Sequence, residues 1–251
     1  IGPGAFNYCY SLESITIPES VTSIGSDAFY YCYGLRSVTF GENSQLTSIG
    51  DYAFLGCYSI ESITIPASVT SIGEWAFVEC YRLVEVWNLS KLNITAGSED
   101  NGYVGYYAKR VETEPSESYV YTDENGYVIY YDGKVKALIN YTGNETKLTI
   151  PDDITELNCF ALSDCYNITS VTFGENSQLT SIGDGAFNWC ESLESITIPD
   201  SVTSIGEGAF CCCAKLTSIT IPDGVKSIGN HAFAGCSALE SITLPDSVLN
   251  I

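Results

Sequence analysis

Methionine is absent from the 251 residues, histidine occurs once, and basic residues are scarce, with 10 Lys or Arg against 31 Asp or Glu. The resulting formal charge of −21 repels phosphate backbones and anionic membrane surfaces, so we expect no nucleic-acid partner. The same charge is consistent with simple solubility or with attraction of cations and basic protein surfaces. No apolar run approaches the roughly 18 to 20 residues of a membrane span, so no direct membrane insertion is expected.

The sequence also lacks the residues of a typical enzyme site. His231 is the single histidine, and it lies at a variable position of a repeated segment, where sister segments carry Asp, Trp or Gly. Activation of a Ser or Cys nucleophile by histidine would depend on that position. No G-x-S-x-G, P-loop, H-E-x-x-H or G-x-G-x-x-G motif occurs. Glu42 and Glu175 recur in one repeated loop, so we interpret them as parts of the repeat and not as a glycosidase pair. We predict no enzymatic activity and no cofactor.

A repeat with a period of 23 residues dominates the chain. The aromatic residue that follows Ala marks its phase, with steps of 23 or 25 residues on either side of one 85-residue step. The marker positions are Phe6, Phe29, Phe54, Phe77, Leu162, Phe187, Phe210 and Phe233. Both 25-residue steps contain TFGENSQLTSIG, at 39–50 and 172–183, where two added residues predict a loop insertion on one edge of the coil.

Each repeat predicts one short strand followed by a tight return path. Ile15 and Ile17 alternate with polar residues, which is the period of a strand, and Pro18 ends it. Apolar residues along the return path face inward, but a single repeat cannot cover them. Neighbouring repeats that stack at the roughly 4.7 to 4.9 Å spacing of strands do cover them. The sequence therefore predicts a β-rich solenoid with 23-residue repeats.

The pattern AF-x-x-C-x-x-L-x-S-I-T-I-P-x-S-V-T-S-I-G resembles the BspA-like leucine-rich repeat of bacterial and protist surface proteins. The resemblance covers residues 1–86 and 146–251. It implies a curved, right-handed leucine-rich-repeat coil of the α/β repeat class, an extracellular or cell-surface localisation, and a role in adhesion or in binding a protein or glycan. Because Met is absent and the chain opens within a repeat, we expect a fragment whose targeting segments lie elsewhere.

Three regions are expected along one continuous solenoid: leucine-rich repeats at 1–88, a degenerate repeat with an insertion at 89–145, and leucine-rich repeats at 146–251. Asn125-Gly126 and Asp132-Gly133 favour tight hairpin turns, so we predict a small antiparallel β insertion. Nine of the 18 tyrosines lie in this central region. Two interpretations stay open for them: a binding surface, or side chains that pack an irregular sheet against the adjoining repeats.

Eight of the 11 cysteines recur three residues after the aromatic marker and predict a buried ladder of small apolar side chains. They are Cys9, Cys32, Cys57, Cys80, Cys165, Cys190, Cys213 and Cys236. Disulfides between neighbouring repeats are the alternative. Cys159, Cys211 and Cys212 lie outside the ladder and have no evident partner. We expect no metal site, because zinc sites need paired ligands and the Cys211–Cys213 run has no second pair.

The candidate binding residues are the polar strand positions that point away from the core and the tyrosines of the central region. They are Ser14, Thr16, Ser37, Thr39, Ser62, Thr64, Ser195, Thr197, Ser218, Thr220, Tyr103, Tyr106, Tyr107, Tyr127, Tyr130 and Tyr131. Two hypotheses follow. The chain is either an adhesion or protein-interaction module, or a passive spacer that presents another domain.

Overall fold

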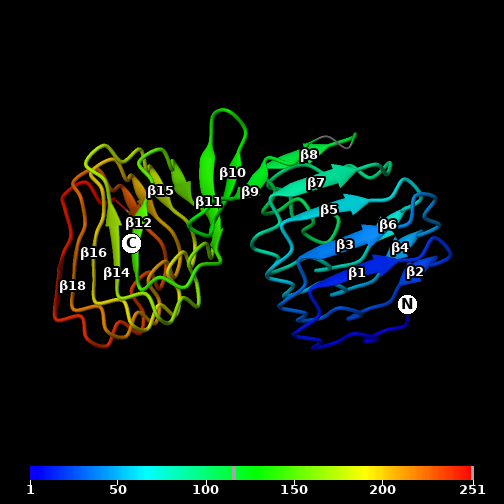
Figure 1. Ribbon diagram of the computed structural model, residues 1–251, viewed down its shortest axis with the longest axis horizontal. Coiled ribbons are helices and arrows are strands. Elements are labelled where there is room, and N and C mark those ends of the chain that lie inside the picture. Colours follow the sequence, from blue (N-terminus) through cyan, green and yellow to red (C-terminus); the bar gives the residue numbers. More distant parts are fainter. Residues whose placement is uncertain (115–116, 250–251) are drawn as a thin grey trace. The chain divides into compact units, whose positions relative to one another are not determined.

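The computed structural model describes residues 1–114 and 117–249, and the chain divides into two units, Ile1–Ser118 and Tyr119–Ile251 (Figure 1). The described residues of both units form strands and turns without a helix. Short strands stack turn upon turn in each unit, which confirms the predicted β-solenoid.

In the first unit, the strands of successive repeats form two parallel sheets. One sheet holds β1 (Ser14–Ile17) and β3 (Ser37–Phe40), the other holds β5 (Ser62–Ile65), β7 (Glu85–Asn88) and β8 (Arg110–Glu112), and the five strands follow one another in Figure 1. A second side holds β2 (Ser23–Ile24), β4 (Ser48–Ile49) and β6 (Ser71–Ile72). Ile15 pairs with Val38, and Ile63 with Val86, so equivalent apolar residues stack as the repeat predicts.

The second unit begins with the predicted antiparallel insertion and continues as a solenoid. The insertion contains β9 (Val120–Thr122), β10 (Tyr127–Tyr131) and β11 (Lys136–Tyr141). One parallel sheet holds β12 (Lys147–Ile150), β14 (Ser170–Phe173), β16 (Ser195–Thr197), β18 (Ser218–Thr220) and β20 (Ser241–Thr243). The other holds β13 (Glu156–Leu157), β15 (Ser181–Ile182), β17 (Ser204–Ile205) and β19 (Ser227–Ile228). Because β11 pairs in parallel with β13, the insertion covers what would otherwise be an open edge of this second sheet.

The return path forms a third ladder between turns, although its backbone is not a strand. Phe29 N–H donates to Ala53 O (2.7 Å) and Tyr31 N–H donates to Leu55 O (2.7 Å). The residues two before and two after the aromatic marker have left-handed φ angles, even where they are bulky, as at Trp75 and Trp189 (both 59°). Such a conformation costs about 1–2 kcal/mol per residue. The hydrogen bonds to the next turn offset this cost.

The core repeats the marker residue, an aromatic except at Leu162, and the cysteine three residues after it. Phe6, Phe29, Phe54 and Phe77 stack with ring centroids 5.0–5.1 Å apart. The cysteine that follows donates its thiol hydrogen to the marker's carbonyl of the preceding turn, as from Cys32 to Phe6 O at 3.0 Å. All 11 cysteines are free thiols, and the ladder members are buried or half-buried, as the sequence predicts.

Candidate interaction surfaces

The outward strand positions form a flat face of hydroxyl groups. Eight of the ten Ser and Thr candidates on these strands are exposed, whereas Ser62 and Thr64 are half-buried. Hydroxyls of adjacent turns bind one another, as between Thr16 and Thr39 (Oγ1 to Oγ1, 2.9 Å). The face is therefore uniform, and part of its hydrogen-bonding capacity is used between its own hydroxyls. Such a face suits broad contact better than recognition of a ligand in a pocket.

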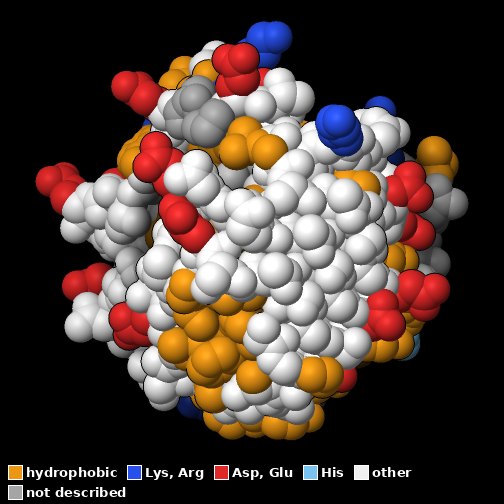
Figure 2. Space-filling view, turned by 90° about the vertical axis from the view of Figure 1, so that its right-hand side faces the viewer, with side chains coloured by type: hydrophobic (Ala, Val, Ile, Leu, Met, Phe, Trp, Pro, Cys, Tyr) orange, Lys and Arg blue, Asp and Glu red, His pale blue; other side chains and the backbone are white. Residues whose placement is uncertain are grey.

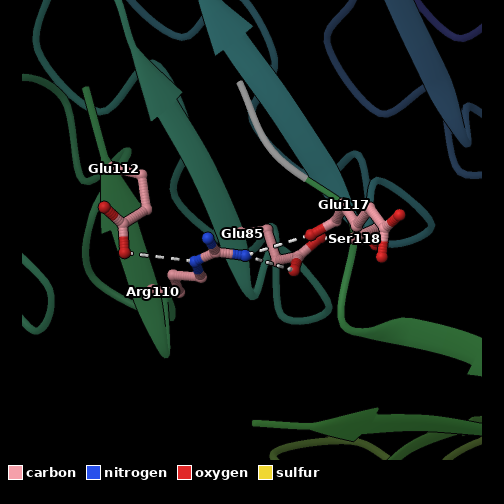
Figure 3. A network of polar contacts seen from close by, with 5 residues as sticks. All are labelled: Glu85, Arg110, Glu112, Glu117 and Ser118. Carbon is pink, nitrogen blue, oxygen red and sulfur yellow. Dashed lines mark hydrogen bonds and ion pairs between the residues drawn. The ribbon is translucent and has the colours of Figure 1, made fainter. Parts of the chain in front are cut away.

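A buried ion pair interrupts the hydroxyl face at the end of the first unit (Figure 3). Glu85 and Arg110 lie in register with Ser62, at the position where other turns carry serine. Glu85 is 1% exposed, and its carboxylate lies 3.8 Å from Arg110 Nη1 and accepts a hydrogen bond of 2.6 Å from Ser118 Oγ. Arg110 also donates to Glu117 O (3.2 Å). A carboxylate buried this deeply requires such partners, so the network holds Arg110, Glu117 and Ser118 beside β7.

Within the antiparallel insertion, the structure corrects two of the candidate binding residues. Tyr127 is 5% exposed and Tyr130 2% exposed, because β10 is the central strand between β9 and β11 and both of its faces are covered. The hydroxyl group of Tyr127 donates a hydrogen bond to Thr149 O (3.0 Å). Burial raises the pKa of Tyr127 to about 12. Tyr127 packs the insertion on the core of the solenoid, whereas the buried ring of Tyr130 lies beside that of Tyr119, with centroids 6.2 Å apart. Tyr131, at the end of the same strand, is 47% exposed.

Tyr103, Tyr106 and Tyr107 belong to the first unit and not to the antiparallel insertion. Tyr106 is exposed and the other two are half-buried. The ring of Tyr107 meets that of Tyr81 edge-on, with centroids 5.3 Å apart. Trp75 and Tyr103 meet in the same manner at 6.4 Å. The three tyrosines therefore extend an aromatic surface that begins in the preceding repeats.

This surface centres on a feature that sequence reasoning missed, a column of stacked tyrosines that we call the tyrosine row. It consists of Tyr10, Tyr33, Tyr58 and Tyr81, one from each successive turn. Their ring centroids are 5.0, 4.9 and 5.5 Å apart, with interplanar angles of 10–19°. The signal was present in the sequence, because each of these tyrosines follows the aromatic marker by four residues.

The tyrosine row is exposed at its first two turns, and Glu79 lies beside it. Tyr10 is 53% and Tyr33 40% exposed. Tyr58 donates its hydroxyl to Glu79 Oε2 (3.2 Å). Partial burial, followed by the charge of Glu79, raises the pKa of the adjacent Tyr31 to about 12. This phenol therefore stays protonated at physiological pH and can donate hydrogen bonds.

Both 25-residue steps form an equivalent open recess beside the strand ends. Its volume is about 540 Å³ in the first unit and 530 Å³ in the second. The lining includes Phe40, Glu42 and Pro66 in the first unit and Phe173, Glu175 and Pro199 in the second. The loop is held in the same way each time, by hydrogen bonds from Ser68 Oγ to Ser44 O (2.8 Å) and from Ser201 Oγ to Ser177 O (3.1 Å). The same loop sequence thus forms the same recess in both units, as expected if Glu42 and Glu175 belong to the repeat.

The space-filling view shows the side of the first unit on which β2, β4 and β6 lie (Figure 2). Uncharged polar groups and backbone fill most of its centre, acidic side chains lie towards its margins, and hydrophobic side chains gather near the lower edge. Among the residues that the structure describes, no group of three or more His, Cys, Asp or Glu is arranged to hold a metal ion. No helix in the described part of the chain is long and apolar enough to cross a membrane.

Parallel strands that stack from turn to turn, with 23 or 25 residues in each turn, define a leucine-rich-repeat solenoid. A family model for the BspA type leucine rich repeat region matches residues 1–98 and 136–251 in six copies, and the chain belongs to this family. It is similar in structure to a leucine rich cell surface protein from Faecalibacterium prausnitzii A2-165, at 29% identity and a TM-score of 0.54, over 99% of this chain and 77% of that one. A leucine-rich repeat protein from Eubacterium ventriosum ATCC 27560 has 24% identity and a TM-score of 0.49, over 97% and 70% of the two chains. No curated protein matches the chain.

Proposed function

We propose that this chain is the protein-interaction module of a cell-surface or secreted adhesion protein, and that its tyrosine row contacts a host or matrix protein. The exposed tyrosines of the first turns carry the proposal. Tyrosine is enriched at the centres of protein interfaces, because its ring buries a large area at a low cost in entropy. The membership of a repeat-scaffold family supports an interaction role, and the similar cell surface protein supports an extracellular setting.

The packing of the row favours a protein over a glycan as the partner. A sugar ring binds an aromatic side chain by stacking on its open face, but both faces of the inner tyrosines of the row, Tyr33 and Tyr58, are covered by neighbouring rings. Stacking of this kind leaves the edges and hydroxyl groups of these inner rings available for contact. These edges suit edge-to-face contact with aromatic side chains and hydrogen bonds to backbone carbonyls of a protein.

Charge complementarity narrows the class of protein further. Residues 1–118 contain 14 Asp or Glu and 5 Lys or Arg, and Glu79 lies within the aromatic surface. A field of this sign attracts basic surfaces and repels acidic ones. The partner that fits is therefore a protein whose contact surface carries Lys or Arg beside aromatic or apolar groups.

The test is binding to an immobilised panel of extracellular-matrix proteins at physiological salt. The double variant Tyr10→Ser/Tyr33→Ser is compared with Tyr121→Ser/Tyr131→Ser, which removes two equally exposed tyrosines (43% and 47%) from the second unit. Loss of two interface anchors weakens binding by about tenfold or more. We expect that loss for the first variant only. Equal loss in both variants would contradict the tyrosine row as the binding surface, and no saturable binding by the parent chain would favour the spacer function.

A further inference from the structure

Three consecutive cysteines, Cys211, Cys212 and Cys213, lie in one turn of the second unit, and only the third belongs to the buried ladder. Cys213 is fully buried and donates its thiol hydrogen to Phe187 O at 3.2 Å. Cys211 and Cys212 are half-buried, and their Sγ atoms lie 3.5 Å apart, in hydrogen-bonding contact. The ladder does not explain this pair.

The backbone of the return path brings the two sulfurs together. Adjacent residues of a strand point to opposite faces, which would keep the thiols apart. Here Cys212 has a left-handed φ of 61°, and its N–H donates to Ala234 O (2.7 Å) while Cys211 O accepts from Trp189 N–H (2.9 Å). The hydrogen bonds to both neighbouring turns hold this conformation. Glu79, Trp189 and Gly235 occupy the equivalent left-handed position in other turns, so the thiol pair is particular to this one.

We propose that Cys211 and Cys212 are the redox-active site of this chain, a vicinal dithiol that forms a reversible disulfide with a small disulfide as oxidant. In the first step, one thiolate attacks a sulfur of the oxidant RS–SR and releases RS⁻, leaving a mixed disulfide. In the second, the neighbouring thiolate attacks the protein sulfur of that mixed disulfide and releases the second RS⁻. The two protein protons pass to the two released thiolates. Two cysteines are oxidised, and RS–SR is reduced to two RSH.

Burial, followed by the hydrogen bond with Cys212, raises the pKa of Cys211 to about 11. Whichever sulfur attacks first does so as the thiolate, and the other sulfur lies 3.5 Å away, where it can resolve the mixed disulfide. The fully buried ladder thiols are poor first nucleophiles, because burial raises the pKa of Cys57 and of Cys190 well above the ordinary value. Cys236 is half-buried and lies near the pair, so its contribution is tested directly by the variant Cys236→Ser.

The geometry also predicts an easily reduced product. Disulfides normally join Cα atoms about 4.4–6.8 Å apart, whereas consecutive Cα atoms across a trans peptide are about 3.8 Å apart. A disulfide between neighbours is therefore strained, and strained disulfides are the labile ones. Its formation must also shift the peptide that bonds to Ala234, so oxidation is expected to speed amide exchange at Cys212.

The experiment treats the native full chain with oxidised glutathione, alkylates the remaining thiols and maps the products by mass spectrometry. Cleavage after Glu207 and Asp223 isolates the three consecutive cysteines from the other eight. We expect this peptide to lose two hydrogen atoms without retaining glutathione, with Cys213 alkylated, and to recover them in dilute dithiothreitol.

Two variants test whether the disulfide joins Cys211 to Cys212. Cys212→Ser removes one partner, so Cys211 is expected to retain any glutathione that it acquires and to form no internal disulfide. Cys236→Ser removes the nearby ladder thiol and is expected to leave the reaction unchanged. The proposal is overturned if the native peptide keeps both hydrogens, if Cys212→Ser still loses them, or if Cys236→Ser abolishes the disulfide.

Discussion

The two units have the same backbone pattern and the same kind of core, but they differ at the outward positions of the return path. Four residues after each aromatic marker, the first unit carries tyrosine in four successive turns. The second unit carries Tyr166, Glu191, Ala214 and Ser237 at the same positions. The cores do not differ in this way, since Phe187 and Phe210 stack at 5.0 Å as Phe29 and Phe54 do. The inward residues thus maintain one scaffold, and the outward residues decide what each unit can bind.

The largest expected effect tests the equivalence of the cores. Phe54→Ala and Phe210→Ala each remove a fully buried ring from a continuous stack. Replacement of a buried phenylalanine by alanine costs about 3–5 kcal/mol. We expect the two variants to lower the unfolding midpoint in urea by similar amounts. A large loss in one unit only would show that the cores are not equivalent.

The ends of the strand sheets differ as well, because only the first unit contains the Glu85–Arg110 pair. Glu85→Ser leaves the guanidinium of Arg110 without its buried partner and is expected to cost about 2–3 kcal/mol of stability. The matched variant Glu85→Ser/Arg110→Ser restores the serine of other turns at both positions and should recover most of that loss. Urea unfolding measures both. Equal destabilisation by the single and double variants would contradict the pairing.

A smaller effect on stability is expected when the tyrosine row is introduced into the second unit. Glu191→Tyr, Ala214→Tyr and Ser237→Tyr together extend Tyr166 into a four-residue row on the second unit. Each new stacked pair is worth about 0.5–1.5 kcal/mol, so the variant is expected to fold with equal or greater stability. With a partner identified from the matrix panel, calorimetry should show a second binding site. One site, with unchanged affinity, would show that the row alone is insufficient.

The smallest expected effect concerns Tyr31, whose pKa of about 12 depends on partial burial and then on Glu79. Glu79→Gln removes the nearby charge and is expected to lower that pKa part of the way towards the ordinary value of 10.0, as measured by the ultraviolet absorbance of tyrosinate. In the parent, the folded state holds this proton at a higher pH than the unfolded chain. Stability is therefore lost as pH rises between about 10 and 12, and Glu79→Gln should flatten this loss. An unchanged titration would contradict the role of Glu79.

The sequence was sufficient to predict the scaffold because one period governs every buried position. Leu162 shows this well: it was identified by phase alone, and it is fully buried where phenylalanine lies in other turns. The antiparallel insertion was equally predictable from its two glycines, but its turns differ from the tight two-residue kind. Residues 123–126 and 132–135 form four-residue loops, in which Gly126 and Gly133 have the positive φ angles of 86° and 90° and the preceding Asn125 and Asp132 do not.

Surface roles were harder to predict, for reasons that particular residues make clear. Alternation along β10 cannot show that the strand lies between two others, so the burial of Tyr130 was missed. The strand at Arg110–Glu112 was also missed, because Glu85 and Arg110 replace the serines by which the repeat is recognised. The tyrosine row is in phase with the repeat, but the same positions carry Glu191, Ala214 and Ser237 in the second unit, so the repeat does not by itself mark them as a surface feature.

Hydrogen–deuterium exchange of the chain with and without a bound matrix protein tests the central claim most directly. The tyrosine row predicts slower exchange in the peptides that contain Tyr10, Tyr33 and Tyr58, and no change in the equivalent turns around Glu191 and Ala214. Protection confined to the strands β1, β3 and β5, or to the insertion around Tyr131, would contradict it.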